Sequence, residues 1–295
     1  MNSRSLLLAA SFCLPLQMHA ESPEFMQELH AWEAEMARPS AAPARDLPED
    51  VRTILALEPS ERDEAQAAAL AEYFRGLKED RVAVARKEKG DALRKRFADA
   101  GLPYPPREIF MRAFKHEMEL ELWAREKDGP FREVATFTIT APSGGPGPQR
   151  REGDRQVPEG CYRIEVFNPK SRFHLSLGLN YPNESDRILA DRERPGGEIY
   201  VHGGAVSIGC LPLGDPVIDE VFLAALDTRA RGQSEIRVHI FPARMKGDAW
   251  KNLTAANPEL RAFWEDLQPI HDAFESTHLV PEFRVAADGH YQLSK

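Results

Sequence analysis

Residues 196–215 read GGEIYVHGGAVSIGCLPLGD, and the interpretation of the whole chain starts from this stretch. A short apolar run ends in His202, a Gly-Gly turn follows, and the loop continues through Ser207 and Gly209 to Cys210. An apolar run that meets glycines is typical of a strand followed by a tight reversal. Such a reversal would bring an imidazole to a thiol, the pairing that a cysteine nucleophile needs.

The residues around the thiol have predicted supporting roles. The amides of Gly209 and Cys210 are expected to bind a developing oxyanion, because glycine lets the backbone approach a substrate carbonyl. Ser207 is expected to hydrogen-bond the imidazole or the loop backbone, and so to support the loop instead of reacting. No carboxylate is placed by spacing to orient His202, which leaves a backbone carbonyl as a candidate partner for the ring.

The segment HGGAVSIGC, residues 202–210, resembles the signature of the L,D-transpeptidase (YkuD-type) catalytic domain, in which His-Gly and a spacer precede Ser-x-Gly-Cys. It is most similar to the branch typified by YafK-like murein enzymes. The similarity extends over roughly residues 109–294. It includes the segments at 143–148, 153–154, 158–162, 180–183, 241–245 and 263–264.

The resemblance implies an exported cysteine acyltransferase that acts on peptidoglycan stem peptides through an acyl-enzyme on Cys210, in cell-wall remodelling and without a cofactor. It implies a β-rich fold of mixed sheets. Binding of the substrate is expected from one group of loop residues: Asp154, Arg155, Tyr181, Arg187 and Gly203.

One position departs from the family pattern. Most members carry an arginine two residues after the cysteine, whereas this chain has Pro212. An arginine fork suits carboxylate recognition, so its absence puts classical cross-linking in doubt. Two alternatives stay open: an amidase or hydrolase of the same family that releases a wall-linked lipoprotein, and a catalytically silent wall-binding module.

Composition and the N-terminus favour an exported globular protein. The chain has 295 residues and a formal charge of −9, and this acidic balance argues against a nucleic-acid partner. Residues 1–20 read as a secretory signal, with Arg4, an apolar stretch at 6–16 and Ala20 before the expected cleavage point. That stretch is too short for a transmembrane span. The expected location is the periplasm or cell envelope.

Three parts are predicted: the signal peptide at 1–20, a helical N-terminal region with linkers at 21–106, and the catalytic domain at 107–295. Helical spacing covers 23–36 and 46–101, around a Pro/Ala-rich linker at 38–47. Within the second range a helix cap is expected at Ser60, and breaks are expected at Gly76 and Gly90.

The catalytic part is predicted to be α+β, with short strands and flanking helices. Alternating and apolar runs predict strands at 117–126, 134–140, 161–167, 173–179, 198–202 and 235–241, of which the first two form a hairpin. One helix is predicted to begin with Asp215 as cap and Pro216 as its first residue. A second is predicted to be capped by Asn257 and to bend or stop at Pro269.

Other chemistries remain as alternatives to a cysteine nucleophile. Once a signal is removed, Cys161 and Cys210 could pair as a disulfide, which would abolish nucleophilic chemistry. Zinc could use His202, Cys210, Asp215 and His239, although the chain has neither Cys-x-x-Cys nor His-Glu-x-x-His spacing. No metal is therefore predicted.

Overall fold

The computed structural model of the chain describes residues 22–36, 49–78 and 80–294. The predicted signal peptide and the predicted linker at 38–47 lie outside these residues. The chain divides into two compact units, Met1–Lys78 and Glu79–Lys295. No helix among the described residues combines the length and the apolar character needed to span a bilayer.

The N-terminal unit is a small group of helices. It contains α1 (Pro23–Met36), α2 (Glu49–Leu55), a 3-10 turn (Pro59–Glu61) and α3 (Glu64–Lys78). The prediction at 23–36 is confirmed by α1. Apolar side chains from all three α-helices form the core of this unit: Leu29, Val51, Leu70 and Phe74.

The cap of α3 differs from the prediction. Ser60 lies inside the 3-10 turn, and Asp63 caps α3 instead. The Asp63 carboxylate accepts the amide of Gln66 at 2.8 Å, and the Gln66 side chain accepts the amide of Asp63 at 3.0 Å. This reciprocal pair satisfies two amides that a helix start would otherwise leave free. The predicted break at Gly76 is also wrong, because α3 runs through this residue.

An eight-stranded mixed sheet forms the frame of the C-terminal unit, in the order β3-β2-β1-β8-β4-β5-β6-β7. β1 pairs in parallel with β8 and β6 with β7, whereas the other neighbours are antiparallel. The predicted α+β class and the β2–β3 hairpin are confirmed. The strand bounds are β1 (Glu108–Phe114), β2 (Glu119–Arg125), β3 (Arg132–Thr138), β4 (Gly160–Ser171), β5 (His174–Leu179), β6 (Tyr200–His202), β7 (Leu211–Pro212) and β8 (Arg237–Phe241); β9 (Phe283–Val285) and β10 (Tyr291–Leu293) form a separate hairpin.

Six predicted strands correspond to β2, β3, β4, β5, β6 and β8, with bounds shifted by a few residues. The sequence analysis does not predict β1, and the structure shows why. Six of its seven residues are buried, so both faces of the strand are covered and the alternation that marks a half-exposed strand is missing.

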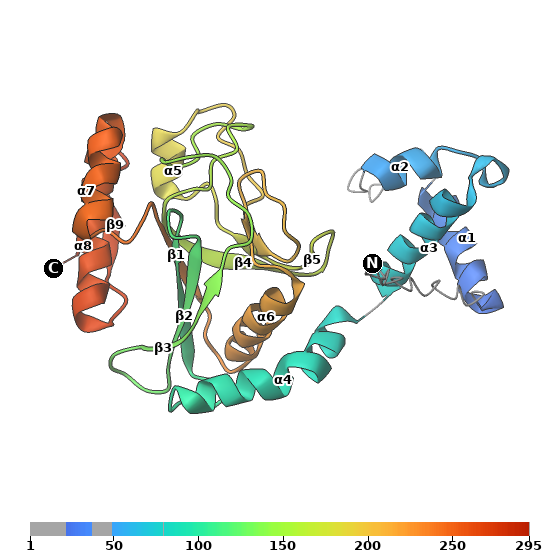
Figure 1. Cartoon of the computed structure of the whole chain (residues 1–295), viewed down its shortest axis with the longest axis horizontal. Helices are drawn as coiled ribbons and strands as arrows, with labels where there is room; N and C mark the ends of the chain where they lie inside the picture. The colour runs from blue at the N-terminus through green and yellow to red at the C-terminus, as the bar shows by residue number, and fades with distance from the viewer. Residues whose placement is uncertain (1–21, 37–48, 79, 295) are drawn as a thin grey trace, which may run out of the picture. The chain divides into compact units, whose positions relative to one another are not determined.

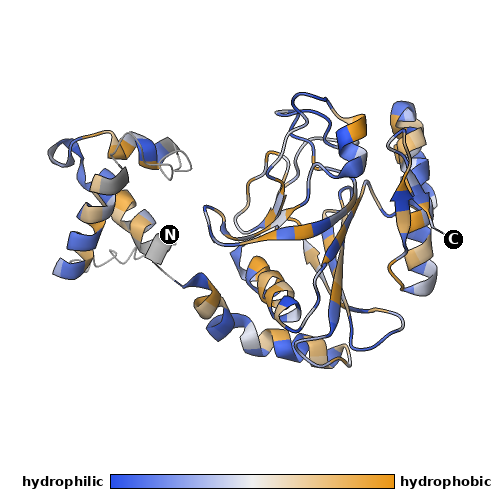
Figure 2. Ribbon diagram, turned by 180° about the vertical axis from the view of Figure 1, so that it is seen from behind, coloured by the Kyte–Doolittle hydropathy of each residue, from blue (hydrophilic) through white to orange (hydrophobic). Residues whose placement is uncertain are grey.

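Helices α4 (Arg81–Asp99) and α6 (Asp215–Ala230) cover one face of the sheet (Figure 1). Hydrophobic residues are concentrated along α6, whereas α4 also carries many polar residues (Figure 2). Leu93 and Phe97 of α4 are fully buried in the same core as Met111 of β1. Because α4 packs in this core, the C-terminal unit includes α4 and starts at Glu79. The start of the catalytic domain at residue 107 stays a prediction.

Two expectations about these helices are wrong. Gly90 does not break α4, because it is buried inside a continuous helix. Asp215 does not cap α6: Gly214 occupies the N-cap position without a side-chain bond, and Asp215 is the first helical residue.

Helices α7 (Gly247–Ala256) and α8 (Arg261–Thr277) lie on the other side of strands β1 and β2 (Figure 1). α8 follows a 3-10 turn at Pro258–Leu260 and continues through Pro269, so the helix does not stop there, and the alternative of a bend stays a prediction. Asn257 makes no cap and donates instead to the Leu253 carbonyl at 2.8 Å.

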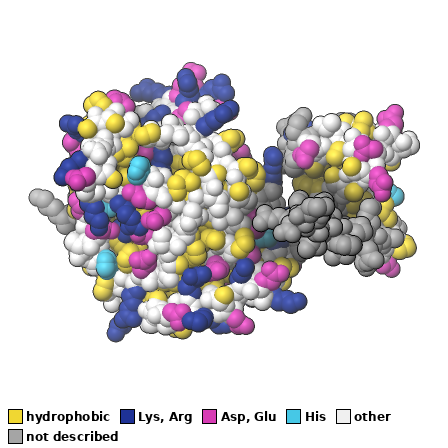
Figure 3. Space-filling view, in the orientation of Figure 1, with side chains coloured by type: hydrophobic (Ala, Val, Ile, Leu, Met, Phe, Trp, Pro, Cys, Tyr) yellow, Lys and Arg dark blue, Asp and Glu magenta, His cyan; other side chains and the backbone are white. Residues whose placement is uncertain are grey.

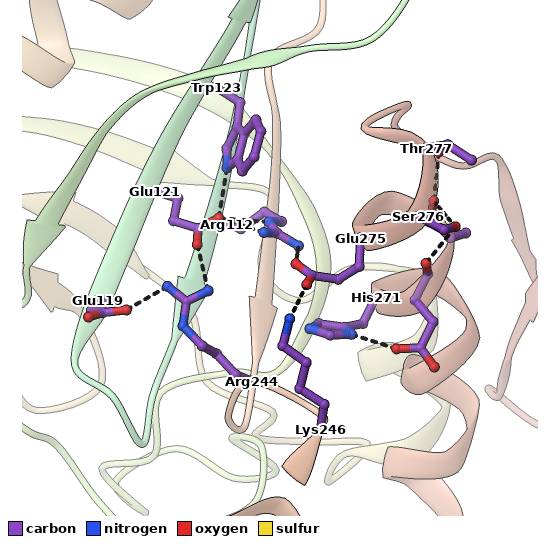
Figure 4. Close-up of polar contacts among 12 residues, drawn as sticks. Arg112, Glu119, Glu121, Trp123, Arg244, Lys246, His271, Glu275, Ser276 and Thr277 are labelled. Carbon is purple, nitrogen blue, oxygen red and sulfur yellow. Dashed lines mark hydrogen bonds and ion pairs between the residues drawn. The ribbon is translucent and has the colours of Figure 1, made fainter.

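The contact between α8 and the sheet contains buried charges (Figure 4). The Arg112 guanidinium donates to Glu121 at 2.7 Å and pairs with Glu275 of α8 at 2.9 Å. The Trp123 indole also donates to Glu121 at 2.7 Å, and Arg244 forms an ion pair with Glu121 at 2.8 Å. Glu121 of β2 is therefore buried and paired with arginines from other elements, whereas Glu119 and Arg125 at the ends of the strand are partly exposed.

Candidate active site

Strands β6 and β7 place the two central residues of the sequence motif on one face. The parallel register pairs Val201 with Leu211 and His202 with Pro212, which puts Cys210 beside Tyr200. Successive side chains of a strand point to opposite faces. Val201 and Leu211 are buried in the core on one face, so His202 and Cys210 share the opposite face.

The His202 ring is buried and held in one tautomer. Nδ1 lies 2.5 Å from the Gly203 carbonyl, which can only accept, so Nδ1 carries the hydrogen and Nε2 is the basic nitrogen of the neutral ring. The Phe173 ring packs against it with centroids 4.7 Å apart. Burial lowers the pKa of His202, against the opposing effect of the Gly203 bond. A backbone carbonyl thus orients the ring, which is neutral at neutral pH.

The Cys210 sulfur lies close to two backbone groups at the start of β6 and just before it. It accepts the Tyr200 amide at 3.4 Å and lies 3.6 Å from the Glu198 carbonyl, to which the thiol donates. Burial raises the pKa of Cys210, the Tyr200 amide lowers it, and the negative charge of Glu198 raises it further. None of the hydrogen bonds among described residues joins this sulfur to His202, and the shifts of both groups favour a neutral thiol beside a neutral imidazole.

Both cysteines of the described residues are free, so the Cys161–Cys210 disulfide is not formed. Cys161 is buried in β4, and burial raises the pKa of its thiol far above the ordinary value. A thiol in that setting is inert, whereas Cys210 is partly exposed.

The turn before Cys210 is held by its own serine. The Ser207 hydroxyl donates to the Cys210 carbonyl at 2.7 Å and accepts the Gly209 amide at 3.1 Å. The Gly209 amide is therefore engaged, which leaves the Cys210 amide as the candidate oxyanion donor. Gly209 has φ +135°, and a Cβ there would lie 3.2 Å from the Gln156 carbonyl, so the turn requires glycine.

The Gly203-Gly204 turn is fixed by α6 and by the tip of the β4–β5 hairpin. Asp215 of α6 accepts the Gly204 amide at 2.7 Å, and the Phe173 carbonyl accepts the Gly203 amide at 3.0 Å. A Cβ on Gly203 would lie 2.5 Å from the Asp215 carboxylate, so a side chain at this position would displace the turn. Gly203 thus supports the position of His202.

Two of the four side chains predicted to contact substrate have bonds that organise loops. The Asp154 carboxylate accepts three backbone amides of its own turn, from residues 150, 151 and 156. Tyr181 is buried and donates to the Pro195 carbonyl at 2.8 Å. Arg155 and Arg187 are exposed, and Arg187 lies on helix α5 (Glu184–Leu189), which the sequence analysis did not predict. Their substrate contacts stay predictions.

The alternative zinc ligands do not gather at one point. No group of three or more His, Cys, Asp or Glu side chains in the described part of the chain could hold a metal ion. His239 lies in β8 with its ring 4.8 Å from that of Phe110. Burial lowers the pKa of His239 to about 3, so it is a neutral core residue.

Phe173 and Glu198 are functional candidates that sequence reasoning missed. Phe173 was placed inside a predicted strand, but it lies in the two-residue turn between β4 and β5. Only tertiary contact brings that turn to His202. Glu198 belongs to the sequence motif, but its backbone carbonyl comes close to the Cys210 sulfur only because the chain returns toward this segment at residue 210.

Comparisons with known proteins place the chain in a family. A search of protein-family models found no match. The protein named "Putative L,D-transpeptidase YafK" of Escherichia coli K12 is 32% identical over 189 residues, which is 63% of this chain and 74% of that relative. The protein of the same name from Escherichia coli O157:H7 gives the same values. The chain therefore belongs to the L,D-transpeptidase family, as its motif predicted.

Solved structures show weaker likeness. The helical cell shape determining protein Pgp2 of Campylobacter jejuni has a TM-score of 0.38 and 16% identity, covering 61% of this chain and 73% of that one. Its K307A mutant has the same TM-score and 18% identity, covering 55% and 58%. Bd1075 of Bdellovibrio bacteriovorus has a TM-score of 0.34 and 18% identity, covering 56% and 59%.

Proposed function

We propose that this protein is an exported cysteine acyltransferase that acts on peptidoglycan stem peptides in the periplasm or cell envelope. The observation that carries the proposal is the β6–β7 register, which presents a neutral imidazole and a partly exposed thiol on one face. Membership of the L,D-transpeptidase family and the identity to a relative with that name support the choice of substrate.

In the proposed reaction, Nε2 of His202 takes the thiol proton as the Cys210 sulfur attacks the peptide carbonyl. The developing oxyanion is bound by the Cys210 amide. Collapse of the tetrahedral intermediate breaks the C–N bond, and the imidazolium returns the proton to the leaving amine. The products of this half-reaction are a free amine and a thioester on Cys210.

The second half-reaction determines the type of enzyme. If an amine attacks the thioester, with His202 again as base, the result is a transpeptidase. If water attacks, the result is a hydrolase, and this form of the chemistry includes the release of a wall-linked lipoprotein. Both outcomes regenerate the thiol and the neutral imidazole.

Muropeptides incubated with the full chain, with and without an added amine, test this proposal by mass spectrometry. We expect a product that depends on Cys210 and is lost by about 10³-fold or more in Cys210→Ala and His202→Ala, since catalytic nucleophiles and bases contribute effects of this size. Cys161→Ala is the matched control and should keep full activity. Unchanged muropeptides with the wild-type protein, together with binding to peptidoglycan, would indicate the silent wall-binding module instead.

A further inference from the structure

His174 fastens the turn between β4 and β5, residues 172–173, to helix α6. Its ring nitrogen Nε2 donates to the buried Asp219 carboxylate of α6 at 2.6 Å. The backbone of His174 has φ +67°, a left-handed conformation that is uncommon for a residue with a side chain. Such a conformation persists where surrounding contacts enforce it, and the bond to Asp219 is one of these contacts.

Helix α4 holds the same turn through its backbone. The Arg81 guanidinium donates to the carbonyls of Ser171 and His174, at 2.6 Å and 2.7 Å. The Ser171 hydroxyl accepts the Phe173 amide at 3.1 Å. Side chains from two helices therefore fix the short turn that carries Phe173.

The β4–β5 turn contacts the candidate base in two ways. The Phe173 ring packs on the His202 imidazole, and the Phe173 carbonyl accepts the Gly203 amide at 3.0 Å. The carbonyl of the same glycine holds Nδ1 of His202. A Cβ on Gly203 would lie 3.0 Å from the Cβ of His174, so the two segments touch. A displaced turn would move both the ring that shields the imidazole and the peptide that sets its tautomer.

The charged groups that act on His174 come from α6 and α4. The hydrogen bond with Asp219 raises the pKa of His174, burial lowers it, the charge of Asp215 raises it and that of Arg81 lowers it, and the net change is an increase. The stabilisation from the ion pair is therefore fully present below the ordinary value of 6.5 and declines as the pH rises through the raised pKa. A neutral ring can still donate to Asp219, so the contact outlasts the charge.

We propose that His174 is a positioning residue whose bond to Asp219 keeps the β4–β5 turn in place against His202. The inference rests on the proposed function for the role of His202 as the base. The held turn keeps Phe173 on the imidazole and the Gly203 carbonyl at Nδ1, so that Nε2 stays free to take the thiol proton. Groups that never touch the substrate can act in this way, because small displacements of a catalytic group cost large factors in rate.

The first test observes the His202 ring in the full chain without substrate. Nitrogen NMR of the histidine rings reports which nitrogen carries the hydrogen, and His202→Ala assigns the signals. We expect one Nδ1–H tautomer in the wild type and a mixture of tautomers in His174→Asn, because the bond at one ring nitrogen sets the state of the other. Asparagine tolerates a left-handed backbone, but its amide is too short to reach Asp219. The pKa of His202 should also move up toward the ordinary value of 6.5 as water reaches the ring.

Three further variants serve as controls for this test. His174→Gln keeps a donor long enough to reach Asp219 and should restore the wild-type tautomer. Lys170→Ala removes an exposed basic residue of the same hairpin and should leave the His202 signals unchanged. The double variant His174→Asn/Asp219→Ala should change them no further than either single variant, because both substitutions break the same bond.

The second test follows turnover of muropeptides. His174→Asn should lower kcat by about ten- to a hundredfold while KM stays within about twofold, because the geometry of the base is lost and the substrate contacts are not. His174→Gln should recover most of kcat. The thermal midpoint of each variant shows whether the fold is retained.

The two tests fail independently of each other. His202 signals in His174→Asn that match the wild type, or that change as much in Lys170→Ala, overturn the inference even if the enzyme is active. A lower thermal midpoint with unchanged His202 signals assigns His174 to stability alone and also overturns it. A mixed tautomer in a protein without turnover supports the inference and rejects the proposed function. If His174→Asn does not fold, Asp219→Ala carries the same test.

Discussion

Buried ionisable groups have charged partners near one end of the sheet, at β1 and β2, but not near the other end, at β6. At β1 and β2, Arg112 and Glu121 are almost fully buried, but each has charged partners. At β6, His202 is equally buried, and among the described residues its ring has one hydrogen-bond partner, a backbone carbonyl, and no charged one. Charged partners offset the cost of burial at the first place, whereas burial without a charged partner favours the neutral ring at the second.

The pKa shifts follow this division. Burial alone would raise the pKa of Glu275, but ion pairs with Lys246 and Arg112 outweigh it and hold the pKa at about 2. For Cys210 and His202, burial dominates and displaces both pKa values toward the neutral forms. The neutral His202 ring, whose Nε2 carries no hydrogen, can accept a proton. The Glu275 carboxylate is held in its ion pairs by Lys246 and Arg112. The comparison therefore distinguishes a structural cluster from a candidate site. Over the face of the C-terminal unit seen in Figure 3, positive and negative side chains are interspersed.

The largest effect is expected from a substitution in the buried ion-pair cluster around Arg112 and Glu121. Glu121→Ala removes the common partner of Arg112, Trp123 and Arg244. We expect the free energy of unfolding to fall by about 3–5 kcal/mol, because the buried Arg112 keeps only Glu275 as a charged partner and the buried Trp123 indole loses its acceptor. Chemical denaturation measures this change. The double variant Arg112→Met/Glu121→Leu should recover most of the loss. A double variant as unstable as Glu121→Ala would show that the lost packing, and not the charge, is responsible.

An intermediate effect is expected at the turn that carries the nucleophile. Ser207→Ala removes two hydrogen bonds, to the Cys210 carbonyl and from the Gly209 amide. Because each bond is worth about 1 kcal/mol, we expect kcat/KM to fall by up to about thirtyfold and the thermal midpoint to fall by a few degrees. Ser207→Thr keeps the hydroxyl and is the matched control. If Ser207→Thr, which keeps the hydroxyl, loses as much activity as Ser207→Ala, the hydrogen bonds do not account for the effect.

The smallest effect concerns the pH profile. His202 must be neutral to act as base, and its lowered pKa places the acid limb of kcat/KM below the ordinary histidine value of 6.5. Phe173→Leu removes the ring that packs on the imidazole and admits water, so we expect this limb to shift upward by several tenths of a pH unit. Rates measured from pH 4.5 to 8 show the shift. A lower maximal rate with an unmoved limb would mean that Phe173 acts only on structure.

Local patterns predicted much of the frame. The helix at 23–36 and the β2–β3 hairpin follow from periodicity and turn residues, which act between near neighbours. The prediction failed where another element covers a face. β1 is buried on both sides, so it lacks the alternation that marks a half-exposed strand.

The candidate site shows the same limit. The spacing of His202, Ser207 and Cys210 indicated the residues and the turn, because a glycine-rich reversal is encoded locally. It could not indicate Phe173, which reaches His202 from the β4–β5 hairpin, or the engagement of Asp215 with the Gly204 amide. These contacts join residues 11 to 29 positions apart that are adjacent only once the sheet has formed.

The sequence by itself determined the family, the motif with its cysteine and histidine, and most secondary structure, because these depend on residue type and short-range order. Tertiary structure alone decided which side chains are kept from water and which of them have partners. Ionisation depends on solvation and on charges brought in from distant parts of the chain. That is why the neutral state favoured for Cys210 and His202 follows only from the folded protein.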